Sequence, residues 1–334
     1  MSLLDRQRVQ LLTLQRIIGG ELKRFEAAYD AMMSGETPLI EDVCAHVRNG
    51  KSKRFRPTLL LLSAKHEGDV PDGAIAAAAC VEMIHTATLL HDDIIDEALT
   101  RRGLPSINEA WGVATAVVMG DYLYSKALDV LAAEGMGEAL RLLAGTTFKM
   151  SQAEMMQLET KHDLAISEET YLTIIERKTA SLIESACAIG AGFHPQHAGR
   201  TEVFGEFGRK IGFVFQITDD IFDYLGDERR LGKPTGQDWE EGRITLPLIA
   251  ALRQAPPAER DALLAEIAAL PPGERRPLWP RVKSFVLDNG GVDYARDLAR
   301  RLGDEGKDAL APVAAGAQKD LLTVAVEYVL RRLN

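Results

Sequence analysis

The stretch Met83-Ile-His-Thr-Ala-Thr-Leu-Leu-His-Asp-Asp-Ile-Ile-Asp96 is an apolar run that ends in three aspartates. The same pattern, Asp-Asp-x-x-Asp, returns 127 residues later, where the mainly apolar residues 210–218 lead into Asp219, Asp220 and Asp223. Two chance copies of this pattern are not expected in a chain of this length. Each apolar run predicts a buried helix that ends at its aspartates, and like charges at a buried helix end need a counter-charge.

The rest of the chain predicts an all-α protein with ten or more helices. Alanine and leucine are abundant, strand-like alternation is scarce, and a 3.6-residue apolar period recurs from residue 5 nearly to the end of the 334 residues. Breaks rich in glycine and proline separate helices, and no linker-like stretch divides the chain. We therefore expect a single domain over residues 1–334.

Composition argues against several classes of protein. A net charge of −10 disfavours a nucleic-acid binder, because phosphate backbones demand a basic surface. Charged residues at positions 5, 6 and 8 interrupt any signal peptide, and no 18 apolar residues run together, so we expect no transmembrane segment. Cys44, Cys80 and Cys187 have neither disulfide nor zinc spacing, so we expect them to pack as small apolar residues in a cytoplasmic protein.

The two aspartate clusters predict a metal site. Residues four apart share a helix face, so Asp92 projects with Asp96 and Asp219 with Asp223. If the two helices face each other, these four carboxylates converge on one cavity, where their repulsion is costly unless cations are bound. Oxygen ligands select hard ions, and Mg²⁺ completes its shell with water and substrate phosphates. The pattern therefore predicts a phosphorylated substrate bridged to the protein by Mg²⁺.

Basic residues on either side of the first motif suit a diphosphate, because arginine forks onto its oxygens. They are Lys51, Lys53, Arg54 and Arg56 before Pro57, and Arg101 and Arg102 after the first motif. His85 lies two helical turns before Asp92 on nearly the same face, where it either donates to a phosphate or is a hydrogen-bonded core histidine. His194 and His197 flank Pro195 and are expected on the surface rather than as metal ligands.

From about Lys53 to Leu252, the chain resembles the polyprenyl synthetase family, the head-to-tail trans-isoprenyl diphosphate synthases, and within it the long-chain octaprenyl, solanesyl and decaprenyl diphosphate synthases. The resemblance rests on seven blocks in the family's order: Lys-Arg-Phe-Arg-Pro (53–57), the block from Glu82 to Asp96, Arg-Arg-Gly (101–103), Gly-Asp-Tyr-Leu (120–123), Glu-Arg-Lys-Thr-Ala-Ser-Leu (176–182), Phe-Gln-Ile-Thr-Asp-Asp-Ile-Phe-Asp-Tyr (215–224) and Gly-Lys-Pro-Thr-Gly-Gln-Asp (232–238). The family's usual Gly-Gly-Lys entry into the first block reads Lys51-Ser52-Lys53 here.

The resemblance implies an isoprenoid synthase fold around a deep central cavity and a role for each matching residue. The implied isopentenyl diphosphate contacts are Lys53, Arg56, His85 and Arg102. The implied allylic diphosphate contacts are Arg101, Lys178 and Lys233. The implied ligands of three Mg²⁺ ions are Asp92, Asp96, Asp219 and Asp223, with Asp93 and Asp220 in support. Thr179 and Gln216 would lie near the developing carbocation.

The chemistry implied is ionisation of the allylic C–O bond, assisted by Mg²⁺ and cationic side chains. The double bond of isopentenyl diphosphate then attacks, and the released diphosphate takes the proton that is lost. Proximity and charge stabilisation carry most of the rate.

Product length is expected to depend on the helix that carries the first motif. In the family the fourth and fifth positions before that motif often decide, and here they are Thr88 and Ala87, both small. Helical geometry puts Thr88 about 40° from Asp92 but Ala87 about 140° away, so the role of Ala87 rests on the resemblance. A long product of about forty to fifty carbons is expected by this analogy. The floor of the tunnel would come from the helix around Leu143, Phe148 and Met150.

Three alternatives remain open. A synthase of the same fold could make a geranylgeranyl or farnesyl product. A class I terpene cyclase would not need a second diphosphate site, which Lys53, Arg56 and His85 argue for. A non-catalytic regulatory subunit could lose its acidic motifs, yet this chain keeps all six aspartates. By analogy we expect a homodimer, transient membrane association through the lipid product, and a quinone side chain as the fate of that product.

Overall fold

The computed structural model describes residues 14–50, 52–66, 69–195, 199–226 and 235–331. Within them it contains sixteen α-helices and one two-stranded hairpin, which confirms the all-α expectation. The elements are α2 (Gly19–Met32), α3 (Pro38–Asn49), α4 (Phe55–Ala64), α5 (Asp72–Ile95), β1 (Thr100–Arg101), β2 (Leu104–Pro105), α6 (Ile107–Trp111), α7 (Val113–Ala133), α8 (Gly137–Glu159), α9 (Glu168–Ile175), the π-helical turn η1 (Glu176–Ala180), α10 (Ser181–Gly192), α11 (Arg200–Leu225), α13 (Gln237–Glu240), α14 (Leu246–Gln254), α15 (Pro257–Ala268), the 3-10 turns η2 (Pro272–Glu274) and η3 (Arg276–Leu278), α16 (Trp279–Asp288), α17 (Gly291–Ala309) and α18 (Ala317–Leu330).

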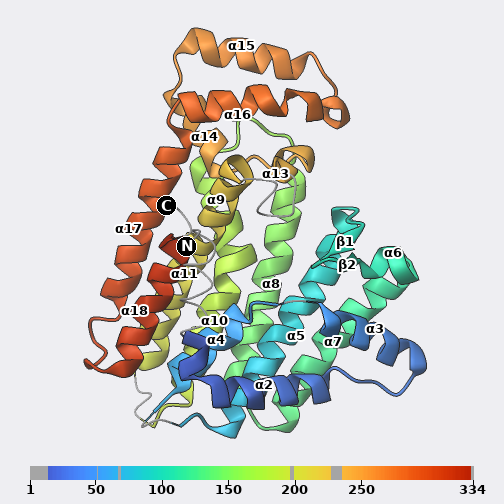
Figure 1. Cartoon of the computed structure of the whole chain (residues 1–334), viewed down its shortest axis with the longest axis vertical. Coiled ribbons are helices and arrows are strands. Elements are labelled where there is room, and N and C mark those ends of the chain that lie inside the picture. Colours follow the sequence, from blue (N-terminus) through green and yellow to red (C-terminus); the bar gives the residue numbers. More distant parts are fainter. Residues whose placement is uncertain (1–13, 51, 67–68, 196–198, 227–234, 332–334) are drawn as a thin grey trace.

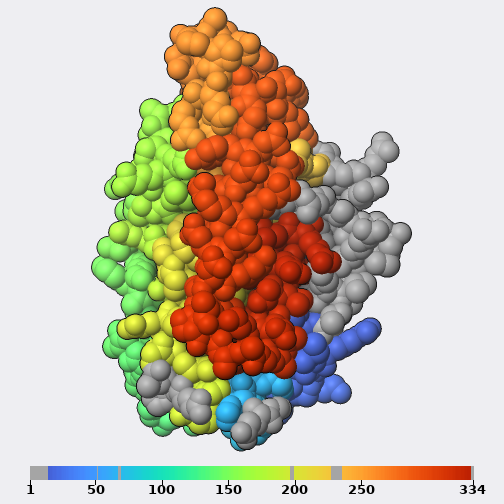
Figure 2. Space-filling model, turned by 90° about the vertical axis from the view of Figure 1, so that its left-hand side faces the viewer, coloured from blue at the N-terminus to red at the C-terminus, as the bar shows by residue number. Residues whose placement is uncertain are grey.

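The long helices α5, α7, α8, α10 and α11 form the body of the molecule, with α2 crossing one end and α15 and α16 crossing the other (Figure 1). Helix α5 packs against α7 and α2, while α10 packs against α11 and α4. The C-terminal helices cover one flank, where they run in orange and red down the face shown in Figure 2. One continuous cluster of buried apolar side chains extends from Leu14 to Val329.

Helix α5 is the central helix of this core. Its alanine-rich sequence favours a helix, and Ala77, Ala78 and Met83 are fully buried. Among the described residues it is the one helix long and apolar enough to cross a membrane, and 72% of its apolar window is buried inside the molecule. It therefore has the character of a core helix, and it ends at Ile95 with Asp96 as its C-cap, as the sequence predicts.

The hairpin that follows α5 carries two of the arginines. Strands β1 and β2 pair antiparallel with Thr100 opposite Pro105, which leaves Arg102 and Gly103 as a two-residue turn. Both turn residues have positive φ, +55° and +83°, and this backbone twist matches that of a tight hairpin. The hairpin therefore places Arg101 on strand β1 and Arg102 in the turn that follows it.

Helix α11 passes close to the π-helical turn η1 about two turns before the second motif. A Cβ added at Gly212 of α11 would clash with Ala180, the last residue of the π-helical turn. π-Helical turns often mark functional positions, because the extra residue shifts side chains out of the regular helical register. Here the close crossing places Thr179 of η1 against Gln216 of α11, one turn before the aspartates.

Two expectations about cysteine and histidine are tested by this fold. All three cysteines are free and buried, as predicted. The expectation that His194 lies on the surface is wrong, because its side chain is buried at the end of α10. There its ring meets that of His66 edge-on, with 4.4 Å between the ring centroids. His197 lies outside the described residues.

Candidate active site

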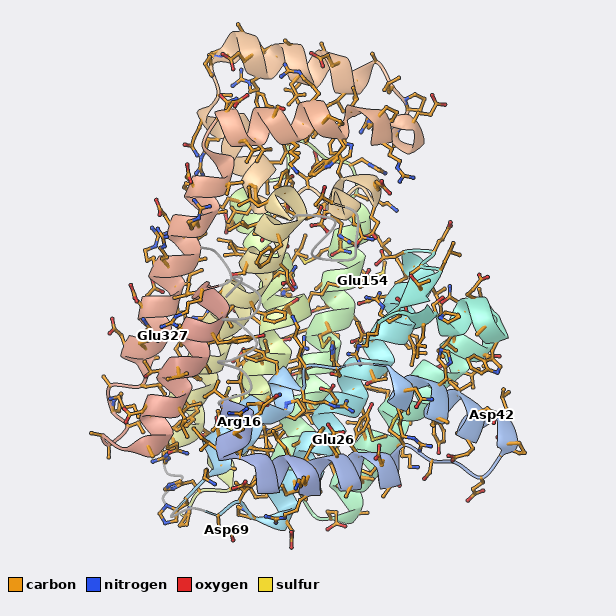
Figure 3. The ribbon with its side chains drawn as sticks, viewed as in Figure 1. Arg16, Glu26, Asp42, Asp69, Glu154 and Glu327 are labelled. Carbon is orange, nitrogen blue, oxygen red and sulfur yellow. The ribbon has the colours of Figure 1, made fainter. Side chains whose placement is uncertain are left out.

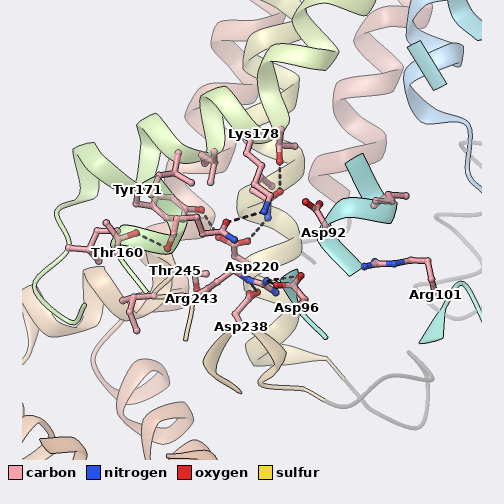
Figure 4. Close-up of a pocket in the computed structure, with 18 residues that line it drawn as sticks. Asp92, Asp96, Arg101, Thr160, Tyr171, Lys178, Asp220, Asp238, Arg243 and Thr245 are labelled. Carbon is pink, nitrogen blue, oxygen red and sulfur yellow. Dashed lines mark hydrogen bonds and ion pairs between the residues drawn. The ribbon is translucent and has the colours of Figure 1, made fainter. Parts of the chain in front are cut away.

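A cavity of about 220 Å³ opens where the end of α5 faces η1, α11 and α13. Eleven of its polar or charged lining residues are Asp92, Asp96, Arg101, Gln157, Thr160, Lys178, Thr179, Gln216, Asp220, Asp238 and Arg243. Figure 4 shows Lys178 and Asp92 directed toward the same space, with Asp220, Asp96 and Arg243 below them. Seven residues predicted from the sequence therefore meet here: Asp92, Asp96, Arg101, Lys178, Thr179, Gln216 and Asp220.

Four carboxylates from three elements line this cavity. Asp92 and Asp96 come from the end of α5, Asp220 from α11 and Asp238 from α13. Convergence of the two motifs is thus observed, but the second motif contributes Asp220 rather than Asp219 or Asp223. Within the described ranges, no three His, Cys, Asp or Glu side chains stand close enough to hold a metal ion on their own. A bound ion would need further ligands from water or substrate.

Arg243 supplies the counter-charge that the acidic residues require. Its Nε lies 2.9 Å from Oδ1 of Asp238, and its Nη1 lies 3.3 Å from both carboxylate oxygens of Asp96. It also pairs with Glu241. Although burial opposes ionisation, the charges of Asp238 and Glu241 raise the pKa of Arg243. Arg243 thereby joins the first acidic motif to the α13 segment across the cavity.

Lys178 is held on the opposite wall by helix α8. Its Nζ lies 2.6 Å from Oε2 of Glu154 and donates to Oε1 of Gln157 at 3.3 Å. Glu154 lies on the upper part of α8, near the centre of the molecule (Figure 3). The ammonium group is therefore fixed beside the aspartates of α5, where it can meet an anionic substrate.

A chain of hydrogen bonds fixes the amide of Gln216. The Tyr171 hydroxyl donates to Oδ2 of Asp220 at 2.5 Å, and Nε2 of Gln216 donates to Oδ1 of the same carboxylate at 2.8 Å. The Thr179 hydroxyl then donates to Oε1 of Gln216 at 2.8 Å. Both oxygens of Asp220 are occupied, so this buried carboxylate orients the groups around it. Burial and the charge of Asp238 hold the pKa of Asp220 well above its usual value.

Asp223 is bonded to the backbone of the segment that precedes α13. Its Oδ1 accepts from the amides of Gly236 and Gln237 at 3.0 and 3.1 Å, and its Oδ2 accepts from the amide of Asp238 at 3.1 Å. Asp219 is partly exposed on α11, and neither Asp219 nor Asp223 lines the cavity among the described residues. Asp223 anchors the segment that carries Asp238, and the metal-ligand roles expected for Asp219 and Asp223 stay predictions.

The carboxylates of the site are harder to ionise than ordinary ones. Burial raises the pKa of Asp92 to about 6, against the opposing charge of Lys178. Burial, with the charge of Asp238, raises the pKa of Asp223 to about 6, and burial raises that of Glu241 to about 7. These shifts disfavour the charged forms until a cation is bound, as expected of a site built to hold one.

A second polar cluster lies beside the cavity, around His85. Burial, with the nearby charges of Arg56 and Arg102, holds the pKa of His85 well below its usual value, so the ring is neutral at pH 7. Burial also lowers the pKa of Arg56 and of Arg102. Among the described residues, the buried Nε of Arg56 has no hydrogen-bond partner. Several cations and an unpartnered donor around a neutral histidine describe an anion-binding site.

Arg54 holds the basic segment in place. It adopts a left-handed backbone conformation (φ 49°) at the start of α4 and forks onto both carboxylate oxygens of Glu26 at 3.0 Å. Its Nη1 donates to the buried Glu82 of α5 at 3.0 Å, and its guanidinium lies 4.4 Å from the ring centroid of Tyr29. Glu26 lies on α2 near the base of the molecule (Figure 3). Arg54 is therefore structural, which leaves Arg56 for the anion site.

Arg101 and Arg102 also line a second, smaller cavity of about 50 Å³ between α3, α5 and the hairpin. Nε of Arg101 donates to Oδ1 of the buried Asp93 at 2.7 Å. Asp93 thus orients Arg101, and the role expected for it in support of bound metal stays a prediction. Arg101 lines both cavities and stands between the two sites.

The remaining predicted residues lie away from the cavity or outside the described chain. Lys53 is exposed, and its carbonyl accepts from the Gln15 side chain at 2.9 Å. Lys233 lies outside the described residues. Ala87 is buried, and Thr88 is partly buried with its hydroxyl bonded to the His85 carbonyl.

The packing of α8 reduces the number of residues that could form the expected tunnel floor. Leu143 is fully buried and Met150 partly buried, whereas Phe148 is 65% exposed. Phe148 does not face the interior of this chain, so of the three residues only Leu143 and Met150 stay candidates.

Several polar residues of the site were missed by sequence reasoning. They are Asp238, Arg243, Tyr171, Glu154 and Glu82. Asp238 belongs to a recognised block, and its position two residues after a glycine was the available signal. Tyr171 and Glu154 gave no signal, because a lone polar residue on a helix reads as solvent-facing until its neighbours are known.

Comparison with known proteins gives a consistent result. The polyprenyl synthetase family model matches residues 37–274. An octaprenyl diphosphate synthase of Haemophilus influenzae is 31% identical over 95% of both chains, and a short chain isoprenyl diphosphate synthase of Methanothermobacter thermautotrophicus is 34% identical over 86% of this chain and 88% of that protein. The crystal structure of a polyprenyl synthase from Caulobacter crescentus, complexed with calcium and isoprenyl diphosphate, superposes with a TM-score of 0.89 at 31% identity and covers 96% of this chain and 97% of that one.

Proposed function

The chain belongs to the polyprenyl synthetase family and is therefore a prenyltransferase, and we propose that it condenses isopentenyl diphosphate head to tail with an allylic diphosphate in a Mg²⁺-dependent reaction. The observation that carries the proposal is the pairing of a carboxylate-lined cavity, which suits a metal-bound diphosphate, with a separate cationic cluster. One is the cavity with four carboxylates and Lys178, and the other is the cluster of Arg56, His85 and Arg102. A reaction between two diphosphates needs both sites, whereas a terpene cyclase needs one.

The residues of the larger cavity fit a divalent cation. Asp92, Asp96 and Asp238 present carboxylate oxygens, the donor type that Mg²⁺ prefers. A calcium ion accompanies isoprenyl diphosphate in the related Caulobacter protein. We propose that Asp92, Asp96, Asp219 and Asp223 hold three Mg²⁺ ions together with the substrate, with Asp93 and Asp220 in support. When bound, Mg²⁺ supplies charge stabilisation for the leaving diphosphate.

The protein's own groups then orient the two substrates. Lys178, Arg101 and Arg243 neutralise the allylic diphosphate, and Lys233 is proposed to join them. Thr179 and Gln216, locked by Asp220 and Tyr171, present fixed dipoles to the carbon that loses its leaving group. The Arg56 cluster, with Lys53, holds isopentenyl diphosphate so that its double bond faces that carbon. Oriented reactants account for much of the expected rate.

Metal dependence should vary with pH in a direction set by the aspartates. Since the pKa values of Asp92 and Asp223 are raised to about 6, both carry their charge above pH 7 and lose it below pH 6. The Mg²⁺ concentration for half-maximal activity should rise by up to about tenfold per pH unit for each protonated ligand below pH 6. Mg²⁺ titrations of prenyl transfer between pH 5.5 and pH 8 measure this. A constant value across that range would contradict the assignment of these carboxylates.

Loss of Arg56 should weaken the binding of one substrate and leave that of the other unchanged. Arg56→Met should raise the KM for isopentenyl diphosphate by about 10- to 10²-fold, the value of a charge-assisted hydrogen bond, and leave the KM for farnesyl diphosphate nearly unchanged. Folding should not suffer, because burial already disfavours this charge. Steady-state kinetics with each substrate varied in turn measure the split, and Arg141→Met, at an exposed position on α8, is the control. An equal rise in both KM values would contradict a separate second site.

We propose a long product of about forty to fifty carbons, because the fifth and fourth positions before the first motif, Ala87 and Thr88, are small. Relatives include both an octaprenyl and a short-chain synthase, so the family alone leaves length open. A quinone side chain in a cytoplasmic pathway is the proposed context, and the three buried free thiols agree with a reducing compartment.

We also propose a homodimer. Helices α7 and α8 expose large apolar side chains, including Val118, Phe148 and Met155 at 65%, 65% and 60%. Exposed apolar side chains of this size on two neighbouring helices favour burial against a second copy of the chain. Light scattering behind size exclusion should give twice the 36.6 kDa chain mass.

A further inference from the structure

The segment of residues 235–243, here called the α13 loop, connects the second acidic motif to the cavity. It carries Asp238 and Arg243, which line the cavity, and its backbone amides bind Asp223. The helix inside it, α13, has only four residues and cannot hold its own position. Its placement must come from neighbouring elements.

Trp279, the first residue of α16, packs directly on one end of the α13 loop. Gly236 has a φ of +85°, and a Cβ there would lie 2.6 Å from Cδ2 and Cε2 of the indole, so a side chain would collide with the ring. The same indole meets Tyr224, the neighbour of Asp223, with 5.1 Å between ring centroids. Trp279 therefore contacts the two segments that the hydrogen bonds of Asp223 hold together, the end of α11 and the start of the α13 loop.

Two more contacts link α13 to the segment just before Trp279. The indole Nε1 of Trp239 donates to the Arg275 carbonyl at 2.9 Å. Nε of Arg276 pairs with Oε1 of Glu240 at 2.7 Å. Trp239 is buried, so its hydrogen bond is shielded from water and fixes the position of α13 relative to residues 275–279.

His162, in the turn after α8, packs on the other end of the α13 loop. Its amide donates to the Gly242 carbonyl at 2.7 Å. Gly242 has a φ of +77°. The His162 ring occupies the space beside its Cα, so a Cβ on residue 242 would overlap the ring. Gly242 precedes Arg243, so this contact fixes the starting point of the arginine side chain.

We propose that Trp279 and His162 are positioning residues that clamp the α13 loop between two rings seated on glycines, so that Asp238 and Arg243 stand over the cavity. The proposal rests on the proposed function, in which metal and diphosphate are bound there. Neither ring lines the cavity, so each acts through the loop. Trp279 packs on the end of the loop that carries Asp238 and whose amides bind Asp223, so its loss should weaken the response to metal, while the Arg56 cluster keeps its substrate affinity.

The test uses the full chain with Trp279→Ala, Trp279→Phe and, on the same helix, Leu287→Ala, which removes an exposed side chain. Trp279→Ala should raise the Mg²⁺ concentration for half-maximal prenyl transfer about tenfold, as loss of a residue that supports metal ligands does. The KM for isopentenyl diphosphate should stay within about twofold, because the hydrogen bonds and ion pairs described above for the loop involve none of Arg56, His85 and Arg102. Trp279→Phe should recover most of the metal response, and Leu287→Ala should match the original protein.

If Trp279→Ala fails to fold, variants of Gly236 test the same contact between Trp279 and the α13 loop. Gly236→Ala should reproduce the metal shift, whereas Gly273→Ala, where a Cβ meets open space, should not. An unchanged metal requirement in Trp279→Ala or Gly236→Ala, or an equal rise in the KM for isopentenyl diphosphate, would overturn the clamp. Absence of Mg²⁺-dependent transfer in the original protein would instead overturn the proposed function.

Discussion

Replacing Asp92 by alanine should lower turnover by about 10³-fold or more while the helical fold persists, since one preorganised electrostatic group is worth about 10²- to 10³-fold and Asp92 is also a proposed metal ligand. Asp92 lines the cavity one turn before the end of α5 and faces Lys178. No neighbouring carboxylate can move into its place, because Asp96 is engaged by Arg243 and Asp220 by Tyr171 and Gln216.

The fold should tolerate Asp92→Ala for an electrostatic reason. The pKa of Asp92 is about 6 in the folded chain against an ordinary 3.8, so its ionisation above pH 6 costs folding free energy. The variant should therefore melt at the same or a higher temperature at pH 8, measured by circular dichroism. Asp129→Ala, at an exposed position on α7, is the matched control and should keep full activity. Turnover within tenfold of the original in Asp92→Ala would remove the metal assignment.

The variant Ala87→Phe should shift the products from long to short chains. Ala87 is buried on α5, so a phenyl group at this position has to occupy space inside the core. A growing chain that meets this ring stops early, while the first condensation still proceeds, because the two diphosphate sites are unchanged. Thr88→Phe is expected to act in the same direction.

Chromatography of the dephosphorylated products measures the shift in length. Ala262→Phe, at an exposed position on α15, adds the same ring outside the core and should leave the product unchanged. Identical product length in Ala87→Phe, Thr88→Phe and the original protein would remove the assignment of these two positions to chain length.

The parts of the fold that depend on local pattern could be predicted from the sequence. The apolar run before Asp92 specifies a buried helix, and α5 ends at its aspartates as expected. The spacing of Lys178 and Thr179 could be carried over from a recognised block, although the π-helical turn that presents them left no visible signal.

The parts of the fold and of the site that depend on tertiary packing could not be predicted from the sequence. Asp219 and Asp220 are adjacent in sequence, and only the rotation of α11 against η1 makes Asp220 line the cavity. Arg243 follows a glycine in a short acidic stretch that resembles a solvated loop, and its role exists because His162 and Trp279 hold that loop in place. His194 was assigned to the surface because it adjoins a proline, yet it packs on His66, which is distant in sequence.

The central claim is tested most directly by one incubation of the purified protein with Mg²⁺, labelled isopentenyl diphosphate and farnesyl diphosphate, followed by sizing of the products. The account predicts labelled polyprenyl diphosphates that lengthen by one isoprene unit at a time to about forty to fifty carbons, and no transfer when the metal is chelated. Label that stays in isopentenyl diphosphate with active metal present, or a product formed from farnesyl diphosphate alone, would contradict it.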